Sequence, residues 1–322
     1  MSAAPRAAGG QIPEQVRGPS SAPRRAPVTR HASLLEGRIV ASYGRRYLVE
    51  LPDSTTLDCV TRARRGALAC GDRVTVARSA PGQGVIEAAA PRSTLLYRSD
   101  RARHKLIAAN VTQIVVVVAP VPSYHEDLVN RCLAAAENGG IVSLVVLNKV
   151  DLPQAATTLR ALEPYRRLGY RVISLSAKRD LAPLAAHLKG HTSVLVGQSG
   201  MGKSTIVNGL VPDAAARVAE VSAALDSGRH TTTHARLYHL DHASDIIDSP
   251  GMQEFGLRHL DPPELAQAFV EFRAWFGHCR FRDCRHVIEP GCAISAACDR
   301  GEITESRLES YRGLVRERKS GD

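Results

Sequence analysis

The segment GQSGMGKS at residues 197–204 constrains the fold of this chain more than any other segment. It fits the pattern G-x-x-x-x-G-K-[ST] and follows an apolar, β-branched run at residues 193–196 that indicates a buried parallel strand. Glycines at the end of such a strand let the backbone curl, so that several N–H groups point inward at the start of a helix. This succession predicts an anion cradle in an α/β sheet, and a glycine-rich turn before an ordinary helix is the simpler alternative.

The polar side chains of this loop have the chemistry of a nucleotide phosphate site. Lys203 is expected to reach the β and γ phosphates, where it would also act in catalysis, and the Ser204 hydroxyl is expected to ligate Mg²⁺. The predicted phosphate contacts are Gly197, Gln198, Ser199, Gly200, Met201, Gly202, Lys203, Ser204 and Thr205.

A second motif supplies the metal side of the same site. The apolar run at residues 245–248 ends in Asp248-Ser249-Pro250-Gly251, which matches the pattern D-x-x-G. In that pattern the Asp orients Mg²⁺ and the Gly N–H meets the γ phosphate. Between the two motifs, residues 228–233 (GRHTTT) are rich in hydroxyls and predict a switch loop whose threonine closes on Mg²⁺. A solvated loop leading into a strand at residues 234–240 is the alternative for this segment.

The base-reading motif lies before the phosphate loop instead of after it. Asn148-Lys149-Val150-Asp151 follows a buried-strand run at residues 144–147, at the strand end where open α/β sheets bind ligands. The Asp151 carboxylate can accept from guanine N1–H and N2–H₂, a donor pair that adenine lacks, and Lys149 would pack over the ring. Ser176-Ala177-Lys178 ends another strand and would place a backbone N–H near guanine O6. Together these motifs predict GTP or GDP as the ligand, with a P-loop ATPase or kinase as the competing class.

The motif order indicates a circularly permuted sheet. The termini of a doubly wound domain can lie close together, so joining them and reopening the chain elsewhere preserves the packing. The segment after Asp248 then leads directly into the C-terminal region.

That C-terminal region contains the spacing C-x₄-C-x-H-x₅-C, formed by Cys279, Cys284, His286 and Cys292. Three thiolates and one imidazole match a closed, structural Zn²⁺ site with one ion per chain. Two disulfides are the main alternative, but they would leave His286 idle and do not suit a reducing, cytoplasmic compartment. Apolar residues at helical spacing surround the cluster and are expected in its core: Leu265, Phe269, Phe272, Phe276, Leu308, Tyr311, Leu314 and Val315.

Composition points to a polyanionic partner. The formal charge is +10, and of 42 basic residues six are lysines, so arginine, whose planar fork suits phosphate, predominates. Residues 1–33 are rich in Ala, Pro, Gly, Ser and Arg and lack an apolar period, so they are expected to be a disordered basic arm. A transit peptide is the alternative, but the prolines of this segment spoil the amphipathic helix that such a signal needs. Short alternating strands between residues 37 and 89 predict a barrel of the oligonucleotide-binding (OB) kind. No apolar stretch approaches ~20 residues, so we expect no membrane contact.

The combination of GRHTTT, DSPG, GQSGMGKST, NKVD and the zinc spacing resembles the bacterial ribosome-small-subunit-dependent GTPase A family. The resemblance implies a circularly permuted GTPase that acts in late maturation of the small ribosomal subunit and is activated by that subunit and its rRNA. It also implies that Thr232 is the Mg²⁺-linked switch threonine, beside Ser204 and Asp248, and that His230 acts in hydrolysis. Met201 and Thr112 depart from the family pattern without removing a phosphate or base contact.

The hydrolytic chemistry has one gap. Many GTPases place a water-orienting Gln directly after D-x-x-G, but this chain has Met252 there. We therefore expect slow unaided hydrolysis and activation in trans, with a nucleotide-gated rRNA-binding scaffold of little turnover as the alternative function.

The expected architecture is multidomain, and we expect a monomer. Its parts are a basic arm (1–33), an OB-type β-barrel (34–90), a linker (91–105), a circularly permuted P-loop α/β GTPase domain (106–256) and a mostly helical zinc-binding domain (257–322).

Overall fold

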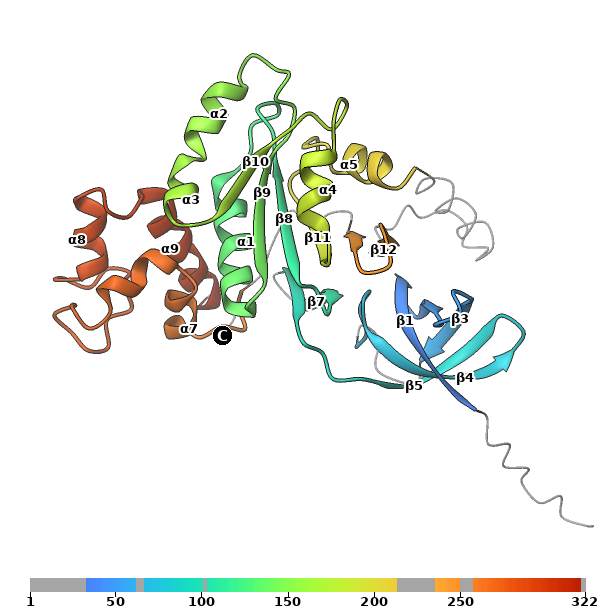
Figure 1. The fold of residues 1–322 in the computed structure, drawn as a ribbon. Helices are drawn as coiled ribbons and strands as arrows, with labels where there is room; N and C mark the ends of the chain where they lie inside the picture. The colour runs from blue at the N-terminus through green and yellow to red at the C-terminus, as the bar shows by residue number, and fades with distance from the viewer. Residues whose placement is uncertain (1–32, 62–66, 101–102, 213–234, 250–256, 320–322) are drawn as a thin grey trace, which may run out of the picture. The chain divides into compact units, whose positions relative to one another are not determined.

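The computed structural model describes residues 33–61, 67–100, 103–212, 235–249 and 257–319, drawn as coloured ribbon in Figure 1. The predicted basic arm, except for residue 33, and the whole of the predicted switch loop (228–233) lie outside these residues. Within the described parts of the chain, every helix is too short or too polar to cross a membrane.

Five strands close into a barrel near the N-terminal end of the described chain. They are β1 (Leu34–Tyr43), β2 (Arg46–Glu50), β3 (Thr56–Thr61), β4 (Arg73–Ala80) and β5 (Gln83–Ala89). Their order is β1-β2-β3-β5-β4, and β4 pairs back onto β1 to complete the ring. Alternate residues such as Ile39, Val49 and Val76 point into a core that belongs to the barrel alone. The predicted OB-type barrel is thereby confirmed.

A hairpin connects the barrel to the next part of the chain. Strands β6 (Leu95–Asp100) and β7 (Arg103–Ala109) pair with each other in a separate two-stranded sheet. The stretch expected to be a linker thus contains regular structure, and the domain boundaries given above remain a proposal.

The central sheet is parallel except at one edge. Its strands are β8 (Gln113–Val118), β9 (Val142–Leu147), β10 (Arg171–Ser174), β11 (Thr192–Val196), β12 (Arg236–His239) and β13 (Asp245–Asp248). They lie in the order β10-β9-β8-β11-β13-β12, and only β12 runs antiparallel to its neighbour. All six residues of β8 are buried, as expected for the middle of a sheet covered on both faces.

The helices of this sheet are α1 (Glu126–Gly139), α2 (Ala155–Ala161), α3 (Glu163–Arg167), α4 (Ala182–Leu188) and α5 (Lys203–Leu210). From β8 the chain first adds β9 and β10 on one side and then returns to place β11 on the other side. The strand order therefore reverses between β8 and β11, which is where open α/β sheets form their ligand crevice.

The C-terminal part is helical. It consists of α7 (Pro262–Gln267), the 3₁₀-helix η1 (Val270–Trp275), α8 (Ala293–Asp299) and α9 (Glu305–Lys319). The Asp261 side chain accepts a hydrogen bond from the backbone of Glu264, whose own side chain accepts from the Asp261 N–H, and this capping box fixes the start of α7. Helix α1 packs against both α7 and α9, so these helices cover one side of the central sheet (Figure 1).

Most of the core positions predicted from helical spacing are confirmed. Leu265, Phe269, Phe272, Leu308, Tyr311, Leu314 and Val315 are all buried. Phe276 is half-buried because the chain does not continue as one helix: α7 ends at Gln267 and gives way to η1. The core around these side chains is continuous with the core beneath the central sheet.

Candidate functional site

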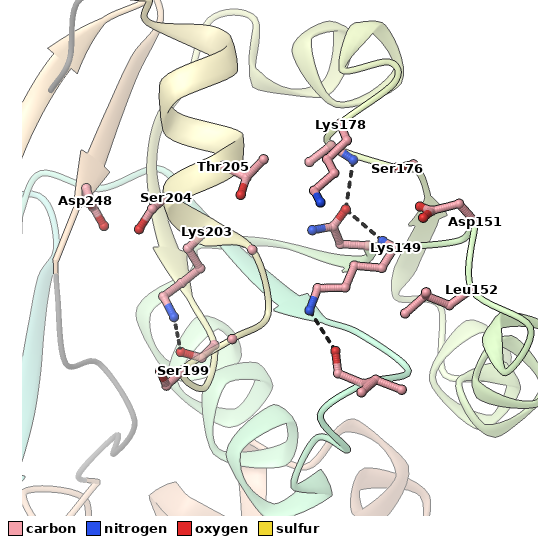
Figure 2. Close-up of a pocket in the computed structure, with 16 residues that line it drawn as sticks. Lys149, Asp151, Leu152, Ser176, Lys178, Ser199, Lys203, Ser204, Thr205 and Asp248 are labelled. Atoms are coloured by element: carbon pink, nitrogen blue, oxygen red, sulfur yellow. Dashed lines mark hydrogen bonds between the residues drawn. The ribbon is translucent and has the colours of Figure 1, made fainter.

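A cavity of about 690 Å³ opens at the carboxyl ends of the central strands (Figure 2). It gathers the predicted base-reading and phosphate-binding segments. Along the chain α2, α3, β10, α4 and β11 lie between Asp151 and Gly197. Its lining comprises Val121, Asn148, Lys149, Asp151, Leu152, Ser176, Ala177, Lys178, Gly197, Ser199, Gly200, Gly202, Lys203, Ser204, Thr205 and Asp248.

Glycine is required at two positions of the phosphate loop. Gly197 has φ 152° and Gly202 has φ 96°, values that other residues rarely adopt. A Cβ atom on Gly197 would lie 2.3 Å from the Val117 carbonyl oxygen, and one on Gly202 would lie 2.3 Å from Nδ2 of Asn148. The loop can therefore pass this close to β8 and to the base-reading segment only with bare backbone at these positions.

Lys203 begins helix α5 and turns its ammonium group back into the loop. Its Nζ donates to the carbonyl oxygens of Gly197 at 2.6 Å and Gln198 at 2.8 Å. Burial lowers the pKa of Lys203, and the nearby Asp248 opposes that shift. A positive charge at a helix N-terminus, surrounded by loop N–H groups, is an arrangement that binds phosphate.

Asp248 ends β13 on the opposite side of the loop. Burial raises its pKa, and Lys203 opposes that change. Figure 2 shows the Ser204 side chain beside Asp248, with Thr205 next along α5. A hydroxyl and a carboxylate that face one cavity next to a phosphate loop suit Mg²⁺, which binds through few protein oxygens.

Asn148 joins the base-reading and phosphate-binding loops. Its Nδ2 donates to the Met201 carbonyl at 2.9 Å, while its Oδ1 accepts from the backbone N–H of Lys149 at 2.8 Å and of Ala177 at 2.9 Å. Asn148 is only 2 % exposed, and its amide oxygen and nitrogen are hydrogen-bonded to the two loops. The sequence placed Asn148 among the nucleotide contacts but did not reveal this bridge. The bridge also occupies the N–H of Ala177, which lies in the segment expected to offer a backbone N–H to guanine O6.

Asp151 and Lys149 stand at the other end of the cavity. Hydrogen bonds from the Ser176 hydroxyl and from its own backbone N–H lower the pKa of Asp151, which is exposed and able to accept hydrogen bonds from a base. Lys149 Nζ donates to the Val121 carbonyl at 2.7 Å, which holds its alkyl stem across the floor of the pocket (Figure 2).

Two lining residues were not foreseen. Val121 follows the end of β8, and Leu152 follows Asp151 directly. The buried run at residues 113–118 was the available signal for Val121, since ligands lie at strand ends.

Several predicted residues do not line the cavity. The Gln198 side chain instead accepts from the backbone N–H of His125 at 2.7 Å, immediately before α1, and Met201 is fully buried. His230, Thr232 and Gly251 lie outside the described residues, so their predicted roles stay predictions.

The C-terminal Cys/His set comes together as the spacing predicts. The ligand atoms of Cys279, Cys284, His286 and Cys292 lie within 4.8 Å of one another, and each of the three sulfurs is 3.5 Å from His286 Nδ1. Bond lengths of about 2.3 Å to sulfur and about 2.0 Å to nitrogen at a tetrahedral angle require an S···N edge of roughly 3.5 Å. The geometry and the donor set therefore fit a tetrahedral zinc ion.

Backbone groups support this cluster. The N–H of Ala293 donates to Cys279 Sγ at 3.3 Å, and that of Ser295 donates to Cys292 Sγ at 3.5 Å. Such bonds favour thiolate, the form that binds metal. All seven cysteines lie in the described residues, and none of them forms a disulfide there.

The fold and the pocket together define a circularly permuted GTPase of the P-loop class. A family model described as RsgA GTPase matches residues 89–258. The chain is 53 % identical to the small ribosomal subunit biogenesis GTPase RsgA of Nitrosospira multiformis, over 87 % of this chain and 90 % of that protein. It is 50 % identical to the protein of the same name from Nitrosomonas europaea, over 88 % of this chain and 91 % of the relative. The chain belongs to the RsgA GTPase family.

Solved structures agree with this assignment. YjeQ from Thermotoga maritima superposes with a TM-score of 0.66 at 30 % identity, over 89 % of this chain and 99 % of that one. YloQ, described as a circularly permuted GTPase, gives a TM-score of 0.63 at 27 % identity, over 92 % of this chain and 99 % of that one. The permuted order inferred from the two nucleotide motifs is thereby confirmed.

Proposed function

We propose that this protein hydrolyses GTP when it is bound to the small ribosomal subunit, and that the nucleotide state controls its binding and release during late maturation of that subunit. The observation that carries the proposal is the single cavity in which Asp151 faces the base end and Lys203, Ser204 and Asp248 face the phosphate end. The names of the relatives at 50–53 % identity support the ribosomal partner.

The roles of the residues that line the cavity agree with its geometry, and those of Thr232 and His230 come from the sequence alone. Asp151 accepts the two guanine donors, Lys149 packs along the ring, and the loop N–H groups with Lys203 hold the phosphates. Ser204, Asp248 and Thr232 would hold Mg²⁺, which neutralises charge on the β and γ phosphates when bound. His230 would orient the attacking water, because Met252 stands where many GTPases carry a water-orienting Gln.

The cysteine cluster has a structural role in this proposal. Cys279, Cys284, His286 and Cys292 would hold one zinc ion, with no position left for a substrate. Zinc would cross-link the segment before α8, which carries all four ligands.

The direct test is the GTPase rate of the purified protein against added small subunits, with large subunits as the control. We expect stimulation of about 10³-fold or more by small subunits, the scale of activation in trans, and little by large ones. His230→Ala should keep GTP affinity and lose the stimulated rate. If single-turnover hydrolysis is equally slow with and without small subunits, the protein is a nucleotide-gated scaffold.

Base recognition has its own test. Asp151→Asn should weaken GTP binding strongly, since an amide cannot accept both guanine donors, and should improve binding of xanthosine triphosphate, whose C2 carbonyl accepts from the amide. Retained GTP affinity in this variant would contradict the assignment of Asp151. Asp180→Asn, a surface change on the same side of the sheet, is the matched control.

A further inference from the structure

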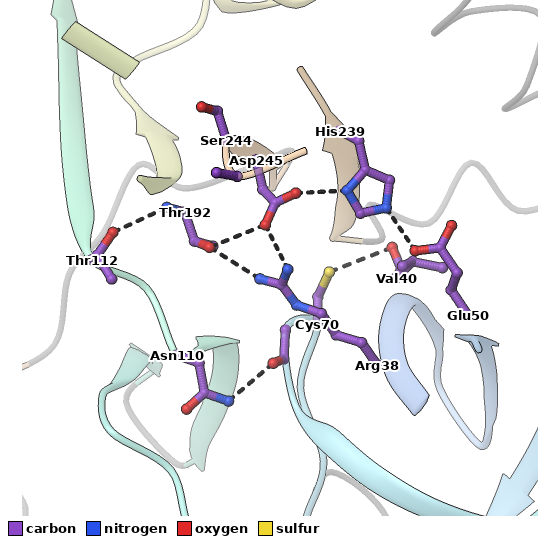
Figure 3. Close-up of polar contacts among 12 residues, drawn as sticks. Arg38, Val40, Glu50, Cys70, Asn110, Thr112, Thr192, His239, Ser244 and Asp245 are labelled. Atoms are coloured by element: carbon purple, nitrogen blue, oxygen red, sulfur yellow. Dashed lines mark hydrogen bonds and ion pairs between the residues drawn. The ribbon is translucent and has the colours of Figure 1, made fainter. Parts of the chain in front are cut away.

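A network of charged side chains joins the barrel to the start of the strand that carries Asp248 (Figure 3). Arg38, on β1 of the barrel, donates through Nη1 to Asp245 Oδ2 at 2.5 Å and through Nη2 to Thr192 Oγ1 at 3.1 Å. The Thr192 hydroxyl donates in turn to Asp245 Oδ2 at 3.2 Å. One guanidinium therefore fastens the first residues of both β11 and β13.

The other oxygen of Asp245 is held from the opposite side. His239 on β12 lies 2.6 Å from Asp245 Oδ1 through Nδ1 and 2.6 Å from Glu50 Oε2 through Nε2, and Glu50 belongs to barrel strand β2. Burial would raise the pKa of Asp245, but hydrogen bonds from His239 and Arg38 outweigh it and keep the pKa below its usual range. The Asp245 side chain is 9 % exposed, so both of its oxygens are fixed in a largely water-free position.

The strands that begin at this network end at the phosphate site. In the sheet register Thr192 pairs with Asp245 and Leu195 pairs with Asp248. Strand β11 runs on into Gly197 of the phosphate loop, and β13 ends at Asp248, about 10 Å from Asp245 at ~3.3 Å per residue. Asp245 and Asp248 lie on opposite faces of the strand, so any influence passes through the strand backbone.

We propose that Arg38 and Asp245 are positioning residues for the Mg²⁺ and γ-phosphate side of the site: by fixing the starts of β11 and β13, they set where Asp248 lies relative to Ser204 and Lys203. This inference rests on the proposed function. The guanine end is not included, because Asp151 and Ser176 follow β9 and β10, on the far side of β8 from the network.

The test measures how nucleotide binding depends on Mg²⁺, using a fluorescent N-methylanthraniloyl derivative of the β,γ-imido analogue of GTP. Arg38→Ala and Asp245→Asn should each raise the Mg²⁺ concentration for half-maximal analogue binding about tenfold. This is less than the roughly 10²-fold effect that a displacement of about 1 Å can have on a reaction rate. The double variant should shift the Mg²⁺ midpoint no further than either single variant, because both substitutions break the same Arg38–Asp245 contact. Binding of labelled GDP without Mg²⁺ should stay within about twofold, because it depends on the base and the loop N–H groups.

Matched variants separate positioning from stability. Arg46→Ala removes an arginine whose partner, Asp58, lies in the barrel itself, and should leave the Mg²⁺ midpoint unchanged. Arg38→Lys keeps the charge but not the fork and should recover part of the effect. If Arg38→Ala does not fold, Thr192→Val tests the same network, because it removes the hydroxyl that accepts from Arg38 and donates to Asp245.

Two outcomes overturn the inference. One is an unchanged Mg²⁺ midpoint in folded Arg38→Ala or Thr192→Val protein, and the other is an equal shift in Arg46→Ala. Failure of the parent protein to bind the analogue in an Mg²⁺-dependent way would instead refute the proposed nucleotide function, and this inference with it.

Discussion

The central sheet meets the barrel and the C-terminal helices in two different ways. Towards the barrel the contacts include a part-exposed ionic network around Asp245, and the barrel keeps its own apolar core. Towards the C-terminal helices the apolar core is shared, and Phe269, Phe272 and Tyr311 lie within one continuous cluster that also contains β8 and α1.

Polar groups on the C-terminal side are buried as well. Asn130 of α1 is fully buried, donating to Ser310 Oγ at 2.9 Å and accepting from the Tyr165 hydroxyl at 2.9 Å. The Arg307–Glu271 ion pair has side chains only 2 % and 5 % exposed, and the guanidinium lies 4.4 Å from the centroid of the Phe269 ring. The comparison indicates that the sheet and the C-terminal helices share one apolar core. The barrel keeps a core of its own and meets the sheet through the ionic network, the pairing of β1 with β12 and a few apolar side chains such as Val40 and Cys70.

The largest effect is expected from Phe272→Ala. Removing a fully buried phenyl ring from a shared core costs about 3–5 kcal/mol of unfolding free energy. Urea unfolding followed by Trp275 fluorescence and by far-UV circular dichroism should shift together, because one core unfolds. Ile288→Ala, at an 86 % exposed side chain, is the control and should change stability by less than about 0.5 kcal/mol. If the Trp275 fluorescence midpoint moved and the circular dichroism midpoint did not, the central sheet and the C-terminal helices would not unfold together.

Next comes Glu271→Gln. It leaves the Arg307 guanidinium buried without a countercharge, which we expect to cost about 3 kcal/mol in the same urea experiment. The exposed pair Arg300–Glu302, with side chains 48 % and 46 % exposed, is the matched control, and Glu302→Gln should cost less than about 1 kcal/mol. Equal losses of unfolding free energy in the two variants would mean that burial does not make the Arg307–Glu271 pair more important for stability than an exposed pair.

A smaller effect, confined to the barrel, is expected from Val49→Ala. Val49 is fully buried in the barrel core, and loss of its methyl groups should cost about 2 kcal/mol. The Trp275 transition should not move, since Trp275 packs against the other core. A matching shift of the Trp275 midpoint would show that the barrel and the rest of the protein unfold together.

The smallest expected effect is the pH dependence of the ionic network. Hydrogen bonds that the His239 ring donates to the carboxylates of Asp245 and Glu50, against an opposing effect of burial, raise the pKa of His239 to about 9. Because this folded-state pKa lies above the unfolded value of about 6.5, the stabilisation is full below pH ~6.5 and is lost as pH rises towards 9. The melting temperature of the parent should therefore fall across this range relative to that of His239→Gln. Parallel curves for the two proteins would exclude a charged His239.

Motifs that act through local backbone geometry were readable from sequence. The strand, loop and helix around Gly197, the strand ending at Asp248 and the Cys/His spacing each involve neighbours along the chain, and the structure places them as predicted. The barrel strands were also predictable, because alternation of apolar and polar residues is a local pattern.

Contacts between distant segments were not readable. Arg38 and Asp245 are separated by 207 positions, and nothing in the residues around either one specifies the other. The same holds for the bridge from Asn148 to Met201, since only the sheet order brings the two loops together. The β6–β7 hairpin was missed because a polar, arginine-rich sequence carries no clear alternation.

The pairing of α1 with α9 has a consequence for how the protein is made. Arg131 binds Glu317, 186 positions later, so at bacterial elongation rates α1 waits roughly 10–40 s for its partner to be synthesised. The barrel closes within its first 60 described residues and has no such delay. A nascent chain therefore carries a closed barrel for most of its translation, while the face of α1 that packs on α7 and α9 is still uncovered.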